Sequence, residues 1–521
     1  MSLFPIFSGR PCARLIAAAS VALVAAFFLG CGDAYRPVVT PINPSGPAQQ
    51  PNALAVAISS SSPTSPGIAT IIDYSGDTVV AQAQIGPGPL EFSLDESGSS
   101  GYTLNSDGTL TGFVATSQLR TDPQHVFQST LPPTASPSGL FSPSAGLWTP
   151  DLTGNIVDVF TGSPETFKLA IPVAQTPIAV IGSGTLGQHN YAISQNVPYG
   201  TICNTAPSSV TTDGEADALE TSSYTVSATI PLGACPVYGV ISSDGRRVFV
   251  INRGSDTVTV INSQDNTLDS CTPFTNQNGQ TVTCHPSLPL SSAAMSATGV
   301  TPPNCNLAAD PTCGGMPAVA GPVYAEYNAA TAQLVVADYD GGTISIIDVS
   351  LDEYGNDSAT FGTTYTVKVG NTATPYPASV TVLFDGSRAY TANQGDDSGT
   401  GNGTVSIVNL ASHTVEKTLA VTGHPRTVVS TANSLYGKVY VAAPDSPYLT
   451  IVRTDQDVVD TTILLQGNVV DVRTNNQNGS SGNSNNTSRR PGAGQPCYLP
   501  PALEPAPTGG QTALQVCQTL P

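Results

Sequence analysis

The side chains that could do chemistry in this chain come after short runs of alternating apolar residues. They are mostly acidic or amide groups with a few basic ones among them: Arg253, Asp256, Asp338, Asp340, Asn393, Asp396, Asp397, His424 and Arg426. If the fold brings them together, they form a polar, largely acidic pocket suited to a small ligand or a cation. Asn and Asp also cap turns through their side chains, which would place them in a repeat without any ligand. The sequence favours this structural interpretation, and the ligand pocket is the alternative.

No assembled catalytic or metal-binding signature accompanies these residues. The five histidines are scattered, and no Gly-x-Ser-x-Gly run provides a nucleophile elbow. Residues 338–342 and 395–398 could ligate calcium through oxygen donors, but neither run has the loop of about twelve residues that ends in Glu. The catalytic residues, if any, therefore stay unknown, and we predict no cofactor, with calcium as the one ion that these runs leave open.

A repeated strand–turn–strand pattern positions the candidate residues. Its clearest copies are residues 243–252 with 256–262, and residues 384–393 with 403–409. Each copy has Asp-Gly between two apolar runs, a strong hairpin signal in which both turn positions take positive φ. A period of roughly 50 residues of this kind is typical of a β-propeller, whose four-stranded blades bury their faces against one another. Loops and blade connections on one face would then pool the candidate residues around the channel mouth.

The copies resemble the YVTN-type β-propeller repeat, in which Ser-x-Asp-Gly precedes a Tyr-Val-x-Asn strand and a Val-Ser-Val-Ile-Asp strand. The match is close over residues 234–466 and weaker before them. The resemblance implies an all-β propeller in a family of binding and scaffold proteins. Related propellers include lactonases and quinoprotein dehydrogenases. The quinoprotein interpretation fails because that family has a tryptophan in nearly every blade, and this chain has only Trp148.

Two functions follow from the resemblance and the candidate residues. The first is a binding or scaffold module for an envelope protein, a glycan or a small ligand. The alternative is a hydrolase resembling the propeller lactonases, which would use the acidic channel mouth with or without a divalent metal. The missing acid/base and metal signatures favour the binding module.

The strand-like runs divide residues 53–474 into a single propeller of seven to eight blades. Eight units can be counted, while the family more often has seven. The first unit begins at Ala53 and lacks its innermost strand. Residues 468–473 form an unassigned run, rich in β-branched residues, just after the last unit. We predict that this C-terminal strand closes the first blade and removes its open edge.

The N-terminus has the features of an export signal. Residues 1–30 combine a basic start with an apolar stretch too short for a comfortable transmembrane helix. Gly30 and Cys31 resemble a bacterial lipobox, which implies that acylated Cys31 anchors the protein in the cell envelope, at the outer membrane if the host is Gram-negative. An ordinary secretory signal is the alternative. The Pro-rich residues 31–52 predict an extended tether.

Eight cysteines remain besides Cys12 and Cys31, and an even number in an exported chain indicates disulfides. Four local pairs are predicted, each closing an irregular insertion: Cys203 with Cys235, Cys271 with Cys284, Cys305 with Cys313, and Cys497 with Cys517. The competing zinc interpretation lacks any Cys-x-x-Cys run. The last pair lies in residues 475–521, which we predict to be a low-complexity tail.

The charge of the chain restricts its partners. With a net charge of −20, the protein repels nucleic acid phosphates, so we exclude nucleic acid as a partner. The predicted partners are the membrane, through Cys31, and a protein or a glycan. The sequence leaves the oligomeric state open.

Overall fold

The computed structural model describes residues 54–475, apart from 96, 121–126, 131–136, 143–145, 163–164, 183–188, 200, 202, 204–209, 277–278, 311, 396–401 and 432–436. The side chains of residues 120 and 127–130 are not described either. Cys31, Asp396, Asp397, Cys497 and Cys517 lie outside the described residues, so the predictions for them stay predictions.

The first four sheets follow one another along the chain and are named blades 1 to 4. Blade 1 contains β1 (Leu54–Ser60), β2 (Pro66–Asp73), β3 (Thr78–Pro87) and β34 (Asn468–Thr474). Blade 2 contains β4 (Pro89–Leu94), β5 (Ser100–Asn105), β6 (Thr109–Val114) and β7 (Phe127–Thr130), with the 3-10 helix η1 (Ser117–Arg120) before β7. Blade 3 contains β8 (Leu147–Asp151), β9 (Ile156–Gly162) and β10 (Glu165–Pro172). Blade 4 contains β11 (Pro177–Gly182), β12 (His189–Ser194), β13 (Asp213–Glu220) and β14 (Val226–Ala234).

Four more sheets complete the ring as blades 5 to 8. Blade 5 contains β15 (Pro236–Ile241), β16 (Arg247–Asn252), β17 (Thr257–Asn262), β18 (Thr267–Leu268) and β21 (Ser287–Pro289). Blade 6 contains β22 (Pro322–Asn328), β23 (Gln333–Asp338), β24 (Thr343–Asp348) and β25 (Thr364–Lys368). Blade 7 contains β26 (Pro377–Val382), β27 (Arg388–Asn393), β28 (Thr404–Asn409) and β29 (Thr414–Ala420). Blade 8 contains β30 (Thr427–Ser430), β31 (Lys438–Ala442), β32 (Tyr448–Arg453) and β33 (Val458–Leu464).

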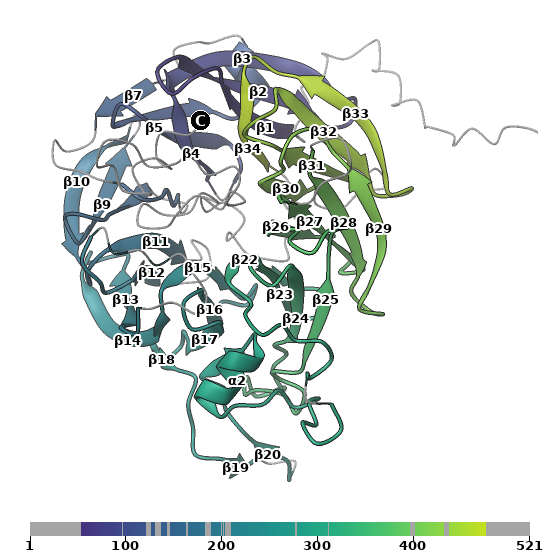
Figure 1. Cartoon of the computed structure of the whole chain (residues 1–521). Helices are drawn as coiled ribbons and strands as arrows, with labels where there is room; N and C mark the ends of the chain where they lie inside the picture. The colour runs from purple at the N-terminus through teal and green to yellow at the C-terminus, as the bar shows by residue number, and fades with distance from the viewer. Residues whose placement is uncertain are drawn as a thin grey trace, which may run out of the picture. The chain divides into compact units, whose positions relative to one another are not determined.

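The all-β propeller fold is confirmed, and its blade number is eight, the upper end of the predicted range. The innermost strands pack side by side around the ring, as β22 does between β15 and β26 (Figure 1). Strands β16 and β23 are almost entirely buried, whereas the outermost β29 and β33 keep many exposed positions. Neighbouring blades cover both faces of the inner strands, which is why those strands are continuous apolar runs.

The hairpin turns differ from the predicted geometry. Gly245 and Gly386 have φ of 68° and 70°, but the preceding Asp244 and Asp385 are not among the residues with positive φ. The Gly245 N–H donates to the carbonyl of Ser242, three residues back. Because each loop is longer than a two-residue turn, only the glycine has to enter the left-handed region.

The predicted closure of the ring is confirmed. Strand β34 pairs antiparallel with β1, from Ala55 opposite Thr474 to Ser60 opposite Asn468. It therefore occupies the innermost position of blade 1, next to β4 of blade 2 and β30 of blade 8. The first and last parts of the propeller are joined by backbone hydrogen bonds rather than by side-chain packing alone.

Blade 5 contains an insertion. Its fourth strand is split, because β18 pairs with the end of β17 and β21 pairs with the start of β17. Residues 270–286, here called the arm, leave the sheet between these two pieces and carry the small ribbon of β19 (Phe274–Thr275) and β20 (Thr281–Val282). Helix α2 (Ser292–Thr298) follows, and Figure 1 shows both projecting from the ring. The insertion thus interrupts a strand.

Three of the four predicted disulfides are confirmed. Cys203 is bonded to Cys235, Cys271 to Cys284, and Cys305 to Cys313. The second of these closes the base of the arm. Disulfides of this kind are typical of proteins outside the cytosol. In the described part of the chain, no helix has the length and apolar character that a membrane span requires.

Candidate functional site

A buried polar pair recurs where the second strand of a blade ends. Asn105, Asn252 and Asn393 each end such a strand, and each side-chain amide donates to hydroxyl groups on the third strand. In blade 7, Asn393 Nδ2 lies 2.9 Å from Ser406 Oγ. The Ser406 hydroxyl also accepts from the backbone N–H of Gly370, in the connection that enters the blade. This pattern supports a structural role for the repeated Asn. The Asn side chain binds the third strand of its blade, however, and does not cap a turn.

Asp338 occupies the same position in blade 6. Its Oδ2 accepts hydrogen bonds from Ser345 Oγ at 2.8 Å and from Thr343 Oγ1 at 3.1 Å, while its Oδ1 has no hydrogen-bond partner among the described residues. Burial raises the pKa of Asp338 well above its usual value, and the two hydroxyl donors only partly offset this. A protonated Asp338 would have the same charge and nearly the same shape as the Asn found in the other blades.

Replacing Asp338 by Asn should therefore remove a pH-dependent loss of stability. A raised folded-state pKa means that the folded protein keeps a proton that the unfolded chain releases above about pH 4, so stability falls as the pH rises toward the folded-state pKa. We expect the Asp338→Asn variant to be more stable than the wild type by about 1.5 kcal/mol near pH 5 and by a larger amount near pH 8. Urea unfolding at the two pH values measures this difference.

The control for this prediction is Asp385→Asn, in an exposed hairpin loop. Partial burial raises the pKa of Asp385, but hydrogen bonds from Ser387 outweigh burial and leave this pKa below its usual value. Its contribution to stability is lost only in acid, so this variant should have the same pH dependence as the wild type between about pH 5 and 8. If Asp338→Asn leaves the free energy of unfolding unchanged at both pH values, Asp338 is not protonated in the folded protein.

Arg253, Asp256 and Asp340 join blade 5 to blade 6. Arg253 Nη2 lies 3.1 and 3.0 Å from the two carboxylate oxygens of Asp340, and its guanidinium lies over the Tyr339 ring. Asp256 accepts hydrogen bonds from the backbone N–H groups of Ala320 and Gly321, in the connection before β22. Burial raises the pKa of Asp256 and of Asp340, and the hydrogen-bonded partners act against that rise. The structure brings these predicted residues together, as ties between blades.

His424 and Arg426 lie in the connection from blade 7 to blade 8 and have different surroundings. His424 Nδ1 is 2.5 Å from Asp445 Oδ2, and this contact outweighs burial to hold the pKa of Asp445 below its usual value. The Arg426 guanidinium is buried and donates to the carbonyl of Val470 in β34 at 2.8 Å. Burial lowers the pKa of Arg426, opposed by the nearby Asp471 and Glu91. Arg426 thus fastens the closing strand, whereas His424 and Asp445 form a partly exposed pair.

The carboxylates of the proposed calcium run are already hydrogen-bonded within the protein. Asp338 accepts from Thr343 and Ser345, and Asp340 pairs with Arg253. No group of three or more His, Cys, Asp and Glu side chains within the described ranges could hold a metal ion. The second proposed run, at residues 395–398, falls mostly outside those ranges.

Sequence reasoning missed a buried ionic cluster at the base of the arm. Arg247 Nη2 lies 3.2 Å from Asp269 Oδ1 and 3.3 Å from Asp357 Oδ1, and His285 Nδ1 lies 2.8 Å from Asp357 Oδ2. Both carboxylate side chains are at most 4% exposed. Burial and the neighbouring Asp357 raise the pKa of Asp269 to about 6, and Arg247 opposes this rise. These four residues, here called the arm-base cluster, bind both ends of the arm to blade 5 and to the loop before β25.

Comparisons with known proteins establish the fold and no more. No protein-family model matches the chain, and no curated protein sequence matches it. Among solved structures, apo AztD from Citrobacter koseri matches with a TM-score of 0.50 and 10% identity, over 81% of this chain and 97% of that chain. The dihydro-heme d1 dehydrogenase NirN in complex with DHE matches with a TM-score of 0.52 and 13% identity, over 85% of this chain and 78% of that chain. At such identities a shared propeller says nothing of shared chemistry.

Proposed function

We propose that this protein is an extracytoplasmic binding module, anchored through Cys31, which contacts an envelope protein through the arm of blade 5. The observation that carries this proposal is the split fourth strand of blade 5, which gives up sheet pairing to project a disulfide-closed ribbon from the ring. Sheet pairing is the ordinary way to satisfy the backbone there, so an element that interrupts it has another role.

The arm has the properties of a rigid contact surface. Its base is closed by the disulfide between Cys271 and Cys284 and fastened by the arm-base cluster. Phe274 on the arm is 43% exposed, and Tyr354 on the adjacent loop of blade 6 is 50% exposed. Asn276 of the arm donates a hydrogen bond to Asp352 of that loop, which places the two segments side by side. Exposed aromatic residues on a preorganised element bind with little loss of conformational entropy.

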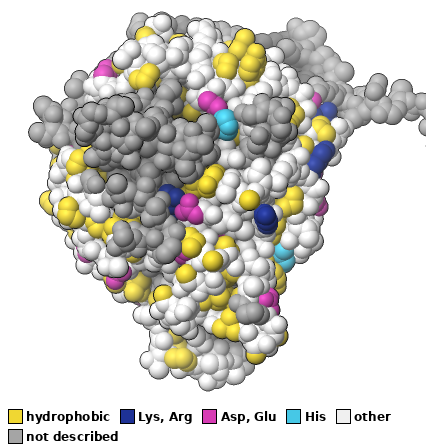
Figure 2. Space-filling view, viewed as in Figure 1, with side chains coloured by type: hydrophobic (Ala, Val, Ile, Leu, Met, Phe, Trp, Pro, Cys, Tyr) yellow, Lys and Arg dark blue, Asp and Glu magenta, His cyan; other side chains and the backbone are white. Residues whose placement is uncertain are grey.

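The rest of the surface offers few charged groups for recognition. On the face shown in Figure 2, Lys, Arg, Asp and Glu side chains are few among the hydrophobic and other side chains of the described residues. The chain has only 10% charged residues. Few charged side chains are therefore present on this face to form local ion pairs with a partner, and exposed aromatic side chains are the better candidates for contact.

A hydrolase resembling the propeller lactonases is the second candidate. One observation favours it, the pairing of His424 with Asp445, because a carboxylate that orients an imidazole is a common arrangement for a general base. The other predicted residues that the structure describes act against it. Arg253, Asp256, Asp338, Asn393 and Arg426 all make hydrogen bonds within the protein.

Photo-crosslinking tests the binding proposal. A photoreactive amino acid is placed at Phe274 on the arm or at Phe167, which is 47% exposed on β10 of blade 3. We expect the chain labelled at position 274 to give a discrete crosslinked product in cell envelopes and the chain labelled at position 167 to give none. An excess of unlabelled wild-type protein should suppress the product, since specific sites are saturable.

Two outcomes would contradict the proposal. Equal crosslinking from both positions would indicate nonspecific contact. Lactone turnover by the wild type that disappears in a His424→Asn variant, with no product from position 274, would favour the hydrolase instead.

A further inference from the structure

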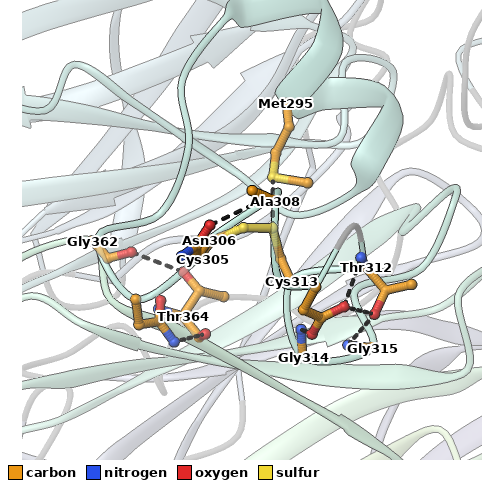
Figure 3. The surroundings of a disulfide bond; sticks show 12 residues. Met295, Cys305, Asn306, Ala308, Thr312, Cys313, Gly314, Gly315, Gly362 and Thr364 are labelled. Atoms are coloured by element: carbon orange, nitrogen blue, oxygen red, sulfur yellow. Dashed lines mark hydrogen bonds between the residues drawn. A yellow bond between two sulfur atoms is a disulfide. The ribbon is translucent and has the colours of Figure 1, made fainter.

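Met295 and Met316 pack against one disulfide. The chain has three methionines, and besides Met1 these are Met295 and Met316. They share a small buried core with Cys305 and Cys313, and these four residues are called the sulfur cluster. Figure 3 shows Met295 reaching from α2 toward the disulfide, with its Sδ 3.6 Å from Cys313 Sγ. Leucine has a similar volume, but methionine also brings a soft thioether sulfur into this core.

The backbone around the sulfur cluster is held in place by its own hydrogen bonds. The Ser291 side chain caps α2, and Gly299 at φ 69° ends the helix, which fixes the position of Met295. On the other side, the Asp310 carboxylate accepts from the backbone N–H groups of Thr312 and Gly314, on both sides of Cys313. The loop that presents Cys313 is therefore ordered independently of the disulfide.

The sulfur atoms are sheltered but close to the surface. Met295, Met316 and Cys313 are 6%, 5% and 8% exposed, while Cys305 is half-buried. Most of the described residues of the loop from 303 to 315 are exposed, so the cluster lies close to the protein surface. A soft metal ion could reach this position and would then be shielded from water.

We propose that, when the disulfide between Cys305 and Cys313 is reduced, the sulfur cluster binds one Cu(I) ion through the two thiolates and the methionine thioethers. Thiolate and thioether are soft ligands that select Cu(I) over magnesium and calcium, and thioethers add little for zinc. Two sulfur ligands about 2.3 Å from one tetrahedral metal ion lie about 3.8 Å apart. The distance of 3.6 Å between Met295 Sδ and Cys313 Sγ already matches that spacing.

The reaction balances with a dithiol as the reductant. The dithiol gives two electrons and two protons and becomes a disulfide, the S–S bond between Cys305 and Cys313 breaks, and each cysteine becomes a thiol. Cu(I) then replaces the two thiol protons, which pass to water, and the copper keeps its oxidation state. Since the oxidised protein has no thiolate here, copper binding depends on the redox state of this one pair.

Copper transfer from a chelator tests the site in the full chain. Wild-type protein is reduced, desalted without oxygen and titrated against Cu(I) bound to bicinchoninate, whose colour is lost when the protein takes the metal. We expect the reduced protein to remove one equivalent and the oxidised protein none. A variant with both Met295→Leu and Met316→Leu keeps both cysteines and should bind Cu(I) roughly tenfold or more weakly.

The disulfide between Cys271 and Cys284, at the base of the arm, provides the control. A variant with Cys271→Ser and Cys284→Ser should bind Cu(I) as the wild type does, and one with Cys305→Ser and Cys313→Ser should lose the binding. Alkylation followed by peptide mapping adds a readout at each residue, in which Cu(I) should protect Cys305 and Cys313 but not Cys271 and Cys284. Equal affinity in the methionine double variant, equal protection of all cysteines, or no copper uptake by the reduced chain would overturn the proposal.

Discussion

A chain that ends at Gln466 should not reach a stable, monodisperse native state, whereas a chain that ends at Asn475 should unfold near the temperature of the full-length protein. The shorter chain loses β34, and with it the innermost strand of blade 1. The exposed edge of β1 would then present unpaired backbone groups, which favour aggregation. Cutting after Asn475 keeps the hydrogen bond between its side chain and the backbone N–H of Leu54.

The expected loss is comparable to the stability of an ordinary domain. Val469, Val470 and Val472 are at most 2% exposed, and burying each such side chain contributes about 1.5–3 kcal/mol. Together they supply about 5–9 kcal/mol against a typical total of about 5–15 kcal/mol. The fully buried Arg473 adds contacts to Asp471 and to the carbonyl of Phe92 in blade 2. Thermal unfolding and size-exclusion chromatography of both truncations measure the effect. Equal melting temperatures for the two would refute closure by β34.

The sequence predicts the fold well because the propeller signal is local and repeated. Each hairpin, such as residues 243–262, contains its own alternation and its own glycine turn, so blades can be recognised one at a time. The closing strand could be predicted because the first unit lacked a strand and residues 468–473 had no other place. The split strand of blade 5 could not, because β18 and β21 are too short to show a periodic pattern.

The candidate site was less predictable, because its residue types serve two purposes. Asn393 and Asp338 suit a ligand pocket and equally suit a buried pair with Ser or Thr, and only their burial distinguishes the two roles. The arm-base cluster was invisible for a different reason. Its partners are far apart in sequence, with Asp357 lying 110 residues after Arg247, and nothing local marks a charge that will be buried.

That cluster gives the second large prediction, which concerns Arg247→Met. Methionine keeps much of the volume of arginine but leaves the carboxylates of Asp269 and Asp357 buried without their shared cation. Removing one partner of a buried ion pair typically costs about 3–5 kcal/mol, because the remaining charge is uncompensated. We expect a loss of this size near pH 7, measured by urea unfolding.

The pH dependence of this loss distinguishes a charge effect from a packing effect. The pKa of Asp269 is already raised to about 6, first by burial and then by Asp357, and without Arg247 it would be higher still. A raised carboxyl pKa means that stability increases as the pH falls toward the unfolded-state value, near about 4. Near pH 5, Asp269 takes up a proton and no longer needs a cation beside it, so the loss should fall to about half.

The neighbouring Arg246 gives a matched control, since its side chain is 44% exposed and lies 3.8 Å from the equally exposed Asp244. Arg246→Met removes the same charge from the adjacent position and should change stability by less than about 0.5 kcal/mol at either pH. A loss in Arg247→Met that is equal near pH 5 and pH 7 would mean that the arginine acts through packing alone. If the loss instead follows the pH as expected, the same variant should weaken crosslinking from position 274. Arg247 contacts Asp269, just before the arm, and is linked through Asp357 to His285, near the end of the arm.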